Sequence, residues 1–381
     1  MIYLVGWQYN GHDDQYPAWF EVNPLLKRPE DATAEESLRW LMREAKKYHT
    51  TVSLHLNMTD AYEDSPLWKT YVKEDLISKN EDGSLMVIGK YNGRKAYQVN
   101  YKNEWEKGYA QHRIQVLLKM LPLQEAGTVH IDAWFARASK GHEESMVTEA
   151  EYQKKICNYW MAHGVDVTSE FIIDYMSGLI PYAWWFNQGS QRYLDIPAKL
   201  YCGGKINPDL KGDQALGFLF GTSMHGEGVW TDFNTFSSRK DWQGLFAERF
   251  YLNSVPYFFL NQFERKSLEG KGQNRMARYS QGVEVHLADS TVRQYQQLLR
   301  KGDDVLFPAI WMQEKALVAY SKEGYQQRVW TLPIGWDHVA EVELYQVSAK
   351  GNVFLKKTKV KKQALTLTLE KGQVILVLAK E

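Results

Sequence analysis

The sequence lacks a long apolar run, a net charge and a set of cysteines, and each absence excludes a class of protein. No stretch of about 18 consecutive apolar residues occurs, which excludes an ordinary transmembrane helix. Lys and Arg together number 46 and so do Asp and Glu, so no net field attracts nucleic acid or an anionic membrane. The two cysteines, Cys157 and Cys202, make no disulfide framework and lack metal-site spacing, so we expect two buried thiols. The composition therefore favours binding partners that are neutral, or that are recognised by interactions other than electrostatic attraction.

The first residues also lack the pattern of a secretion signal. The segment "MIYLVGWQYN" has no basic n-region, no long apolar h-region and no small-residue cleavage site, and it reads as a β-strand. We therefore expect either a cytoplasmic protein or one whose leader is missing from the sequence.

Aromatic residues, in contrast, are abundant. They make up 14% of the chain, with 14 Trp. Flat rings are good platforms for the apolar faces of sugars, and a large aromatic core is the alternative explanation.

The first two-thirds of the chain alternate short apolar runs with amphipathic helical patterns, which is typical of βα units around a parallel sheet. Capping boxes at Thr33–Glu36 and Thr148–Glu151 predict two helix starts, and a further helix is expected over about 105–121. Together these patterns predict a (β/α)8 TIM-type barrel over residues 1–275. The expected strands are 2–7, 51–57, 97–101, 128–134 and 165–171, with weaker ones at 182–186, 198–202 and 217–223.

After about residue 275 the pattern changes to apolar and polar residues that alternate with period two between turn residues. This pattern predicts a C-terminal antiparallel β-sandwich domain over residues 276–381. A barrel followed by such a domain is a common layout for glycoside hydrolases, although a fold alone does not define chemistry.

Two acids carry the candidate chemistry. Asp132 interrupts the apolar run "TVHIDAWF", and Glu170 has the same late position in "VDVTSEF". Catalytic groups of barrels lie at the C-terminal ends of the strands, and neighbouring strands are about 5 Å apart. The two carboxyl groups could therefore have the separation of about 5 to 5.5 Å that is typical of retaining glycosidases. In the alternative interpretation each acid pairs with a nearby Arg or Lys, or faces solvent.

More polar residues follow the first two expected strands. "GHDD" contributes His12 and Asp13, and "LHLNMTDAY" contributes His55, Asn57 and Asp60. Such groups suit hydrogen bonding to sugar hydroxyls, whereas a single histidine is more often structural. A metal site from His12, Asp13 and His55 is a weaker alternative because no local ligand motif supports it, so no metal site is predicted.

These motifs resemble glycoside hydrolase family 101, the endo-α-N-acetylgalactosaminidases that release O-linked glycans from glycoproteins. "GHDDQYPAW", "LHLNMTDAY", "VHIDAW" and "GVDVTSEF" are similar to family segments in the same order along the chain. The resemblance implies that Asp132 is the nucleophile and Glu170 the acid/base. It also implies that His12, Asp13 and Asn57 bind the sugar, and that Trp134 helps to shape the pocket.

The chain departs from the family pattern in two places. Residues 87–100 contain no Trp, where the family has a paired-tryptophan segment, and "FIIDYMSG" follows Glu170 where the family has Trp and glycines. The pocket could therefore admit another α-linked galactose-like sugar or only a terminal one. The resemblance also implies an extracellular, cell-surface or periplasmic location.

We therefore expect a retaining glycoside hydrolase that acts on α-linked N-acetylgalactosamine or galactose-type sugars of glycoprotein glycans. It would need no organic cofactor, and the sequence leaves a structural calcium undecided. Two alternatives stay open, namely a non-catalytic carbohydrate-binding protein and an exo-α-glycosidase of different sugar specificity.

Overall fold

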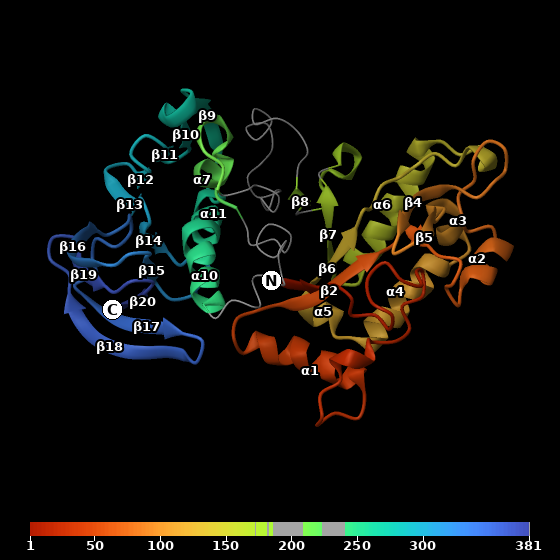
Figure 1. Cartoon of the computed structure of the whole chain (residues 1–381), viewed down its shortest axis with the longest axis horizontal. Helices are drawn as coiled ribbons and strands as arrows, with labels where there is room; N and C mark the ends of the chain where they lie inside the picture. Colours follow the sequence, from red (N-terminus) through yellow and green to blue (C-terminus); the bar gives the residue numbers. More distant parts are fainter. Residues whose placement is uncertain (172, 181–182, 186–208, 223–240, 381) are drawn as a thin grey trace. The chain divides into compact units, whose positions relative to one another are not determined.

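The computed structural model describes residues 1–171, 173–180, 183–185, 209–222 and 241–380 (Figure 1). The chain divides into two compact units, Met1–Ala183 and Trp184–Glu381. Each unit is described by itself below.

The first unit is built around the first four strands of a five-stranded sheet with the order β1-β2-β6-β7-β8, and the division between the units falls within β8. The pairs β1–β2, β2–β6 and β6–β7 are parallel. This confirms a mixed α/β unit with a parallel sheet. The strands are β1 (Ile2–Leu4), β2 (Val52–Asn57), β6 (Thr128–Asp132), β7 (Asp166–Phe171) and β8 (Ala183–Trp185).

Helices accompany this sheet, and one of them begins as the sequence predicted. The Thr33 side chain accepts a hydrogen bond from the Glu36 backbone N–H at 3.1 Å, and Glu36 accepts one from the Thr33 N–H at 3.2 Å. This reciprocal capping box confirms the predicted start of α1. The helices are α1 (Ala34–Lys46), α2 (Trp68–Lys73), α3 (Tyr101–Glu106), α4 (Tyr109–Met120), α5 (Leu123–Ala126) and α6 (Met146–Ala162), with short 3-10 turns η1 (Pro24–Leu26), η2 (Lys140–His142) and η3 (Asp174–Met176).

Two helix predictions were wrong in detail. The helix expected to start at Thr148 starts earlier, because Ser145 accepts from the Thr148 N–H at 3.1 Å and caps α6. The helix expected over about 105–121 is two helices, α3 and α4, separated at Gly108 with φ +80. A left-handed residue interrupts the helical geometry, and glycine adopts it at little cost.

Several strand predictions also need correction. The run 97–101 is not a strand of the parallel sheet, because β5 (Arg94–Gln98) pairs antiparallel with β4 (Val87–Tyr91) and β3 (Asp60–Ala61). Asn100 then caps α3 through the Asn103 N–H at 2.7 Å, which turns the chain into a helix.

The run 217–223 contains helix α7 (Leu216–Phe220), because a short apolar run fits a buried helix as well as a strand. The first strand is also shorter than expected and ends at Leu4. The expected strand 198–202 lies outside the described residues, as do residues 182 and 186 at the edges of the run 182–186.

The core of the first unit is rich in aromatic rings. Cys157 lies in this core, and burial raises the pKa of its thiol to about 12, as expected for an inert buried cysteine; Cys202 lies outside the described residues. These aromatic side chains serve packing, which favours the core explanation for them. The largest fully buried ones are Trp7, Trp19, Trp134, Trp160, Tyr16, Tyr62, Tyr71 and Tyr101.

The second unit contains a large antiparallel sheet, as predicted. Ten strands follow the order β18-β17-β20-β15-β14-β13-β12-β11-β10-β9, and β16 pairs with β19 in a separate two-stranded sheet. Side chains from both sheets, including Trp330 and Leu367 from the small one, share one apolar core. The strands are β9 (Arg265–Glu269), β10 (Met276–Tyr279), β11 (Val283–His286), β12 (Thr291–Gln294), β13 (Gln297–Lys301), β14 (Asp304–Pro308), β15 (Ala316–Ser321), β16 (Tyr325–Thr331), β17 (Glu341–Ser348), β18 (Gly351–Lys359), β19 (Ala364–Leu369) and β20 (Val374–Lys380).

Helical segments precede this sheet in the second unit. The large sheet begins at Arg265, so its first strand precedes residue 275, and a domain boundary at 275 stays a prediction. The segments are η6 (Gly212–Gln214), α7, α10 (Trp242–Arg249), η7 (Phe250–Ser254) and α11 (Val255–Leu260), with η8 (Gly272–Asn274) between β9 and β10.

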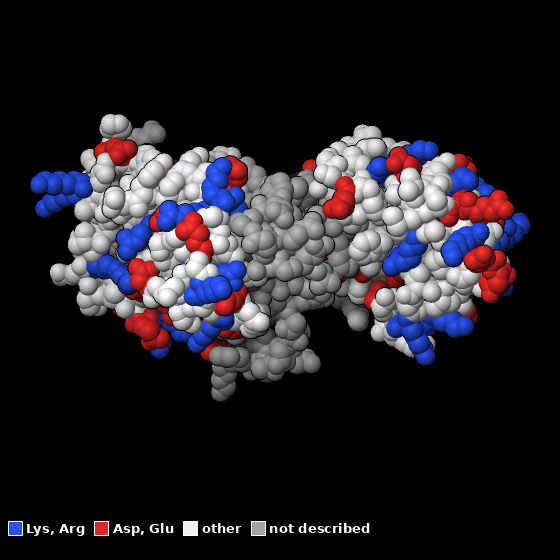
Figure 2. All heavy atoms as spheres, turned by 90° about the horizontal axis from the view of Figure 1, so that it is seen from above, with Lys and Arg blue, Asp and Glu red and all other residues white. Residues whose placement is uncertain are grey.

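Charged side chains of both signs are interspersed on the face shown in Figure 2, as expected for a chain without net charge. Within the described ranges, no helix is long and apolar enough to cross a membrane.

Candidate active site

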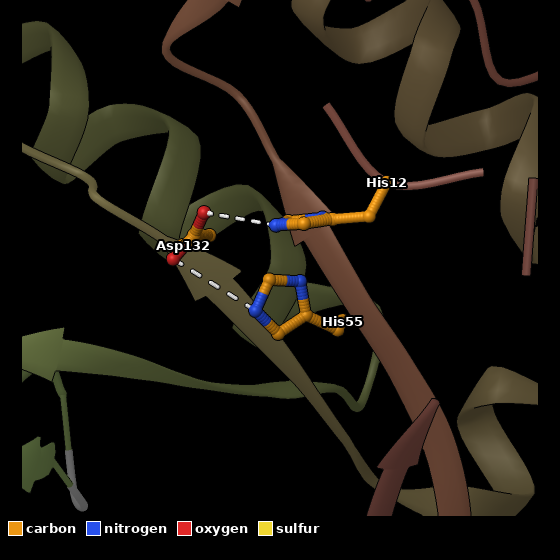
Figure 3. A group of neighbouring side chains, drawn as sticks. All are labelled: His12, His55 and Asp132. Carbon is orange, nitrogen blue, oxygen red and sulfur yellow. Dashed lines mark ion pairs between the residues drawn. The ribbon is translucent and has the colours of Figure 1, made fainter. Parts of the chain in front are cut away.

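Two histidines and an acid meet at the C-terminal edge of the parallel sheet (Figure 3). His55 lies on β2, Asp132 ends β6, and His12 comes from the loop after β1. His12 Nε2 lies 3.8 Å from one Asp132 carboxylate oxygen, and His55 Nε2 lies 3.8 Å from the other. Only 16% of the Asp132 side chain is exposed, so these contacts form in a sheltered environment.

The loop that carries His12 is held by a tyrosine. The Tyr16 hydroxyl accepts hydrogen bonds from Gln8 Nε2 at 2.7 Å and from the Asp13 backbone N–H at 3.3 Å. Its own hydrogen is left for His12 Nδ1, at 3.2 Å. In neutral His12 the ring hydrogen is then on Nε2, the nitrogen that faces Asp132 and lies 3.5 Å from Asp13.

Arg94 on β5 holds the same loop from the other side. Its NH1 lies 2.5 Å from Asp14 and 2.8 Å from Asp64, and its NH2 donates to the Asp13 carbonyl at 3.0 Å. The His12–Asp13 segment is therefore fixed to the β4–β5 hairpin before any ligand binds.

Glu170 is beside Asp132 because β6 and β7 are neighbours in the sheet. The Ala133 N–H donates to Glu170 Oε2 at 3.3 Å, and the Asp132 and Glu170 side chains are hydrogen-bonded to each other. Burial raises the pKa of Asp132 to about 9, and the charges of Glu170, Asp13 and Asp60 add to this effect. Burial and the neighbouring carboxylates thus favour the protonated form of Asp132 in the free protein.

The backbone is unusual directly after Asp132. Ala133 has φ +42, in the left-handed region that residues with a Cβ rarely adopt. Such conformations collect at functional sites, where surrounding contacts hold them in place. Here the Glu170 carboxylate provides one such contact through the Ala133 N–H.

Asn57 lies beside Asp132 in the sheet register, but its side chain is occupied. Its Oδ1 accepts from the N–H groups of Thr59 and Asp60 at 2.8 and 2.9 Å, and its Nδ2 donates to Asp60 Oδ2 at 2.9 Å. Asn57 therefore forms a turn that positions Asp60. Burial raises the pKa of Asp60 to about 6, and the charge of Asp13 adds to the rise.

Trp134 lies in the core, although it is only two residues from Asp132. Its side chain is 0% exposed, and its ring contacts the Tyr101 ring edge-on with a centroid distance of 6.5 Å. Trp134 can therefore shape the site only indirectly, by packing beneath the loop that follows β6.

Among the predicted site residues, the structure thus brings together His12, Asp13, Asp132 and Glu170. The Asn57 side chain is occupied by its own turn, and the Trp134 side chain is buried in the core. The sequence analysis did not place Tyr16 in the site, although Tyr16 belongs to the segment "GHDDQYPAW" that contributed His12.

The donor atoms of His12, His55 and Asp132 lie within 4.8 Å of one another. Two imidazoles and one carboxylate are a ligand set that divalent metals accept, and the same atoms can hydrogen-bond to a sugar. The weaker metal alternative from the sequence consisted of His12, Asp13 and His55. In the structure the group contains Asp132 instead of Asp13.

Comparisons with known proteins place this geometry in context. A family model described as endo-alpha-N-acetylgalactosaminidase, glycoside hydrolase family 101, matches residues 1–245. No curated protein matches the sequence.

Among solved structures, the chain is similar to ligand-free alpha-N-acetylgalactosaminidase NagBb from Bifidobacterium bifidum. The TM-score is 0.55 at 12% identity, over 76% of this chain and 49% of that chain. The complex of NagBb with Gal-NHAc-DNJ gives a TM-score of 0.57 at 12% identity, with 76% and 49% coverage. The chain spans about half the length of these structures, and at this identity the likeness concerns the fold.

The family model covers well over half of the chain and includes the strand ends that carry His12, Asp132 and Glu170. The chain therefore belongs to the endo-alpha-N-acetylgalactosaminidase family, glycoside hydrolase family 101.

Proposed function

We propose that the protein is a retaining glycoside hydrolase that cleaves α-linked N-acetylgalactosamine or galactose-type sugars from O-glycans or related glycoconjugates. The observation that carries this proposal is the contact between Asp132 and Glu170 at the ends of neighbouring strands. Carboxyl groups this close favour the retaining route, because inverting enzymes need room for a water molecule between them.

In this mechanism ionised Asp132 attacks the anomeric carbon while protonated Glu170 gives its proton to the leaving oxygen. A covalent glycosyl-enzyme forms at Asp132 and the aglycone departs with the proton. Glu170, now ionised, removes a proton from water, which attacks the anomeric carbon and releases Asp132. Both carboxyl groups return to their starting states.

The reaction requires that Asp132 is ionised and Glu170 is protonated when the sugar is bound. Entry of the glycosidic oxygen next to Glu170 would provide an acceptor for that proton. The carboxylate left on Asp132 would face His12 and His55, each 3.8 Å away. Imidazoles that carry a hydrogen on the nitrogen facing Asp132 would favour the charged form of this carboxylate.

The sugar hydroxyls would meet His12, Asp13 and Asp60, with Asn57 acting through Asp60. No step needs an organic cofactor, and activity in the presence of EDTA would test whether the group of His12, His55 and Asp132 holds a metal.

We also propose that the parallel sheet is part of a (β/α)8 barrel, which the sheet order and the similarity to NagBb support. Membership of the family supports a glycoprotein glycan as substrate and action outside the cytoplasm. Exo-α-glycosidase action on a different sugar is the second candidate, favoured by the absence of Trp from residues 87–100.

Substitution of each acid tests the proposal. Asp132→Ala should lower kcat by more than about 1,000-fold with the fold intact, because the nucleophile is lost. Glu170→Gln should lower kcat by about 100-fold or more on natural glycans and far less on a 2,4-dinitrophenyl glycoside, whose leaving group needs no proton. Asp166→Asn, at the opposite, exposed end of β7, is the matched control and should keep normal activity.

A mechanism-based fluorosugar followed by mass spectrometry should label Asp132. Near-normal turnover by purified Asp132→Ala would refute the assignment. Glycan binding without any sugar release over days would instead favour a carbohydrate-binding protein.

A further inference from the structure

The spacing within the group of His12, His55 and Asp132 differs from that of a hydrogen-bonded site. Each histidine Nε2 lies 3.8 Å from an oxygen of Asp132, whereas a direct hydrogen bond between nitrogen and oxygen is about 2.7 to 3.2 Å long. Two ligand atoms of a tetrahedral zinc ion, each about 2.1 Å from the metal, lie about 3.4 Å apart. All three donor atoms lie within 4.8 Å of one another, so side-chain movements of about 1 Å would bring them onto one ion.

Both imidazoles are held with Nε2 towards the carboxylate (Figure 3). Their rings meet edge-on, with a centroid distance of 4.8 Å and an angle of 83° between the planes. His55 on β2 is only 4% exposed, and its ring also packs against that of His130 at 5.1 Å. The His12 side chain is 31% exposed on the loop after β1. One side of the group is therefore rigid and the other is open to solvent, which gives an ion a path of entry.

The charges around Asp132 favour a cation at this place. Among the described residues, the ion-pair partners of Asp132 are the two histidines. The charges of Glu170, Asp13 and Asp60 also act on the Asp132 carboxyl group. A site with several carboxyl groups, whose nearest cationic groups are imidazoles, has an excess of negative charge that a dication would neutralise. The ion would displace the proton of Asp132 and bind the carboxylate.

Metal binding at His12 Nε2 requires the ring hydrogen on Nδ1, which is the other neutral tautomer. The surrounding atoms allow this change. Gln8 Oε1 is buried and has no hydrogen-bond partner among the described residues, so a turned Gln8 amide can present this oxygen to the Tyr16 hydroxyl. The hydroxyl then donates to Gln8 and accepts from His12 Nδ1, at the 3.2 Å separation that is already present. Such a partner on the second ring nitrogen is the usual arrangement for a histidine that binds a metal.

The donor atoms narrow the choice of metal. Two imidazole nitrogens and one carboxylate oxygen suit Zn²⁺ and similar divalent transition metals, with water as a further ligand, whereas Mg²⁺ and Ca²⁺ prefer oxygen ligands alone. A histidine next to an acid is not sufficient for such a site. His286 Nε2 lies 3.0 Å from Glu284 in the second unit, but within the described ranges no third donor joins this pair.

We propose that His12, His55 and Asp132 form an inhibitory binding site for a divalent transition-metal ion such as Zn²⁺. The bound ion would occupy the carboxylate that the proposed mechanism uses as nucleophile, so the metal and the sugar would exclude each other. No step of the reaction passes through the ion. The inhibitory effect rests on the proposed glycosidase function, whereas metal binding can be measured without turnover.

Isothermal titration calorimetry with ZnCl2 tests the site directly. The wild-type protein should bind one Zn²⁺ per chain, and MgCl2 or CaCl2 at the same concentrations should give no comparable heat. His12→Gln and His55→Gln should each raise the Kd for Zn²⁺ by about 100-fold, because loss of even an outer partner of a metal ligand typically costs 10- to 100-fold in affinity. His286→Gln removes a histidine that also lies beside an acid, and this matched control should leave the Kd unchanged. Thermal melting checks that each variant is folded, and His12→Gln, on the exposed side, serves if the buried His55→Gln does not fold.

Turnover of a chromogenic α-glycoside tests the inhibition. ZnCl2 at ten times its Kd should raise the apparent KM by about tenfold and leave kcat unchanged, and EDTA should reverse the effect. Absence of zinc binding, or binding that is unchanged in a folded His12→Gln variant, would overturn the inference alone. Zinc that binds at this site without slowing turnover would overturn the inhibitory role. Wild-type protein that binds zinc but hydrolyses no α-glycoside in metal-free buffer would overturn the proposed function, while the calorimetry would still support the metal site.

Discussion

At the end of β6, Asp132 is surrounded by features that oppose its ionisation. Burial is the largest of them, followed by the charges of Glu170, Asp13 and Asp60. A pKa of about 9 means that the folded protein retains a proton which the unfolded chain loses near its ordinary value of 3.8. The contribution of Asp132 to the free energy of unfolding should therefore be most favourable below about pH 4 and should decrease as the pH rises towards 9.

Asp132→Asn removes this titration and should stabilise the protein at neutral pH. We expect a gain of roughly 2 kcal/mol at pH 7, seen as a rise of several degrees in melting temperature, and almost none near pH 4. Asp166→Asn, the exposed control on β7, should show no such pH-dependent gain. An Asp132→Asn variant that is no more stable than wild type at pH 7 would contradict the expectation.

Part of the site could be predicted from single residues and part could not. His12, Asp13, Asp132 and Glu170 were found because parallel strands bring their C-terminal ends to one edge. For Asn57 the sequence does not tell whether the amide is used by its own turn, as it is here through Thr59 and Asp60.

The direction of the Trp134 side chain could not be predicted from the sequence either. The left-handed Ala133 changes the course of the chain after Asp132, and Trp134 turns into the core. Alternation along a regular strand cannot predict this, because the strand has already ended.

At the scale of elements, long periodic segments were predicted well and short ones poorly. The capping box of α1, the strands β2, β6 and β7, and the alternating C-terminal strands all formed. The predictions of parallel strands over 97–101 and 217–223 were wrong, because the structure of such short apolar runs depends on tertiary partners that the runs themselves do not specify. The break between α3 and α4 depends on the conformation of one residue, Gly108.

Two glycines provide a matched test of that break. A Cβ added at Gly108 or at Gly244 would meet nothing within 4 Å, so neither substitution causes a clash. Gly108 has φ +80, whereas Gly244 lies inside α10. Gly108→Ala should therefore destabilise by about 1 kcal/mol, and Gly244→Ala should stabilise by about 0.5 to 1 kcal/mol.

Chemical denaturation followed by circular dichroism measures both glycine variants. Destabilisation by both alanines, or by neither, would contradict the conformational explanation.

At the scale of the whole molecule, equal numbers of acidic and basic residues suit a neutral ligand. The mixed charges in Figure 2 present no surface of one sign on the described part of that face. For a neutral chromogenic α-glycoside, kcat/KM should change less than about twofold between 50 and 500 mM NaCl, because long-range steering is absent. A tenfold fall with salt would indicate selection of anionic glycans and would contradict this expectation.

The backbone at Ala133 has a consequence for directed evolution of the protein. Ala133 is held in a backbone conformation that suits glycine, so the substitution Ala133→Gly could stabilise the protein. The same substitution would also make the orientation of the neighbouring Asp132 side chain less fixed. Screens that select for heat resistance alone should therefore collect changes at this position, and the survivors should be slower catalysts.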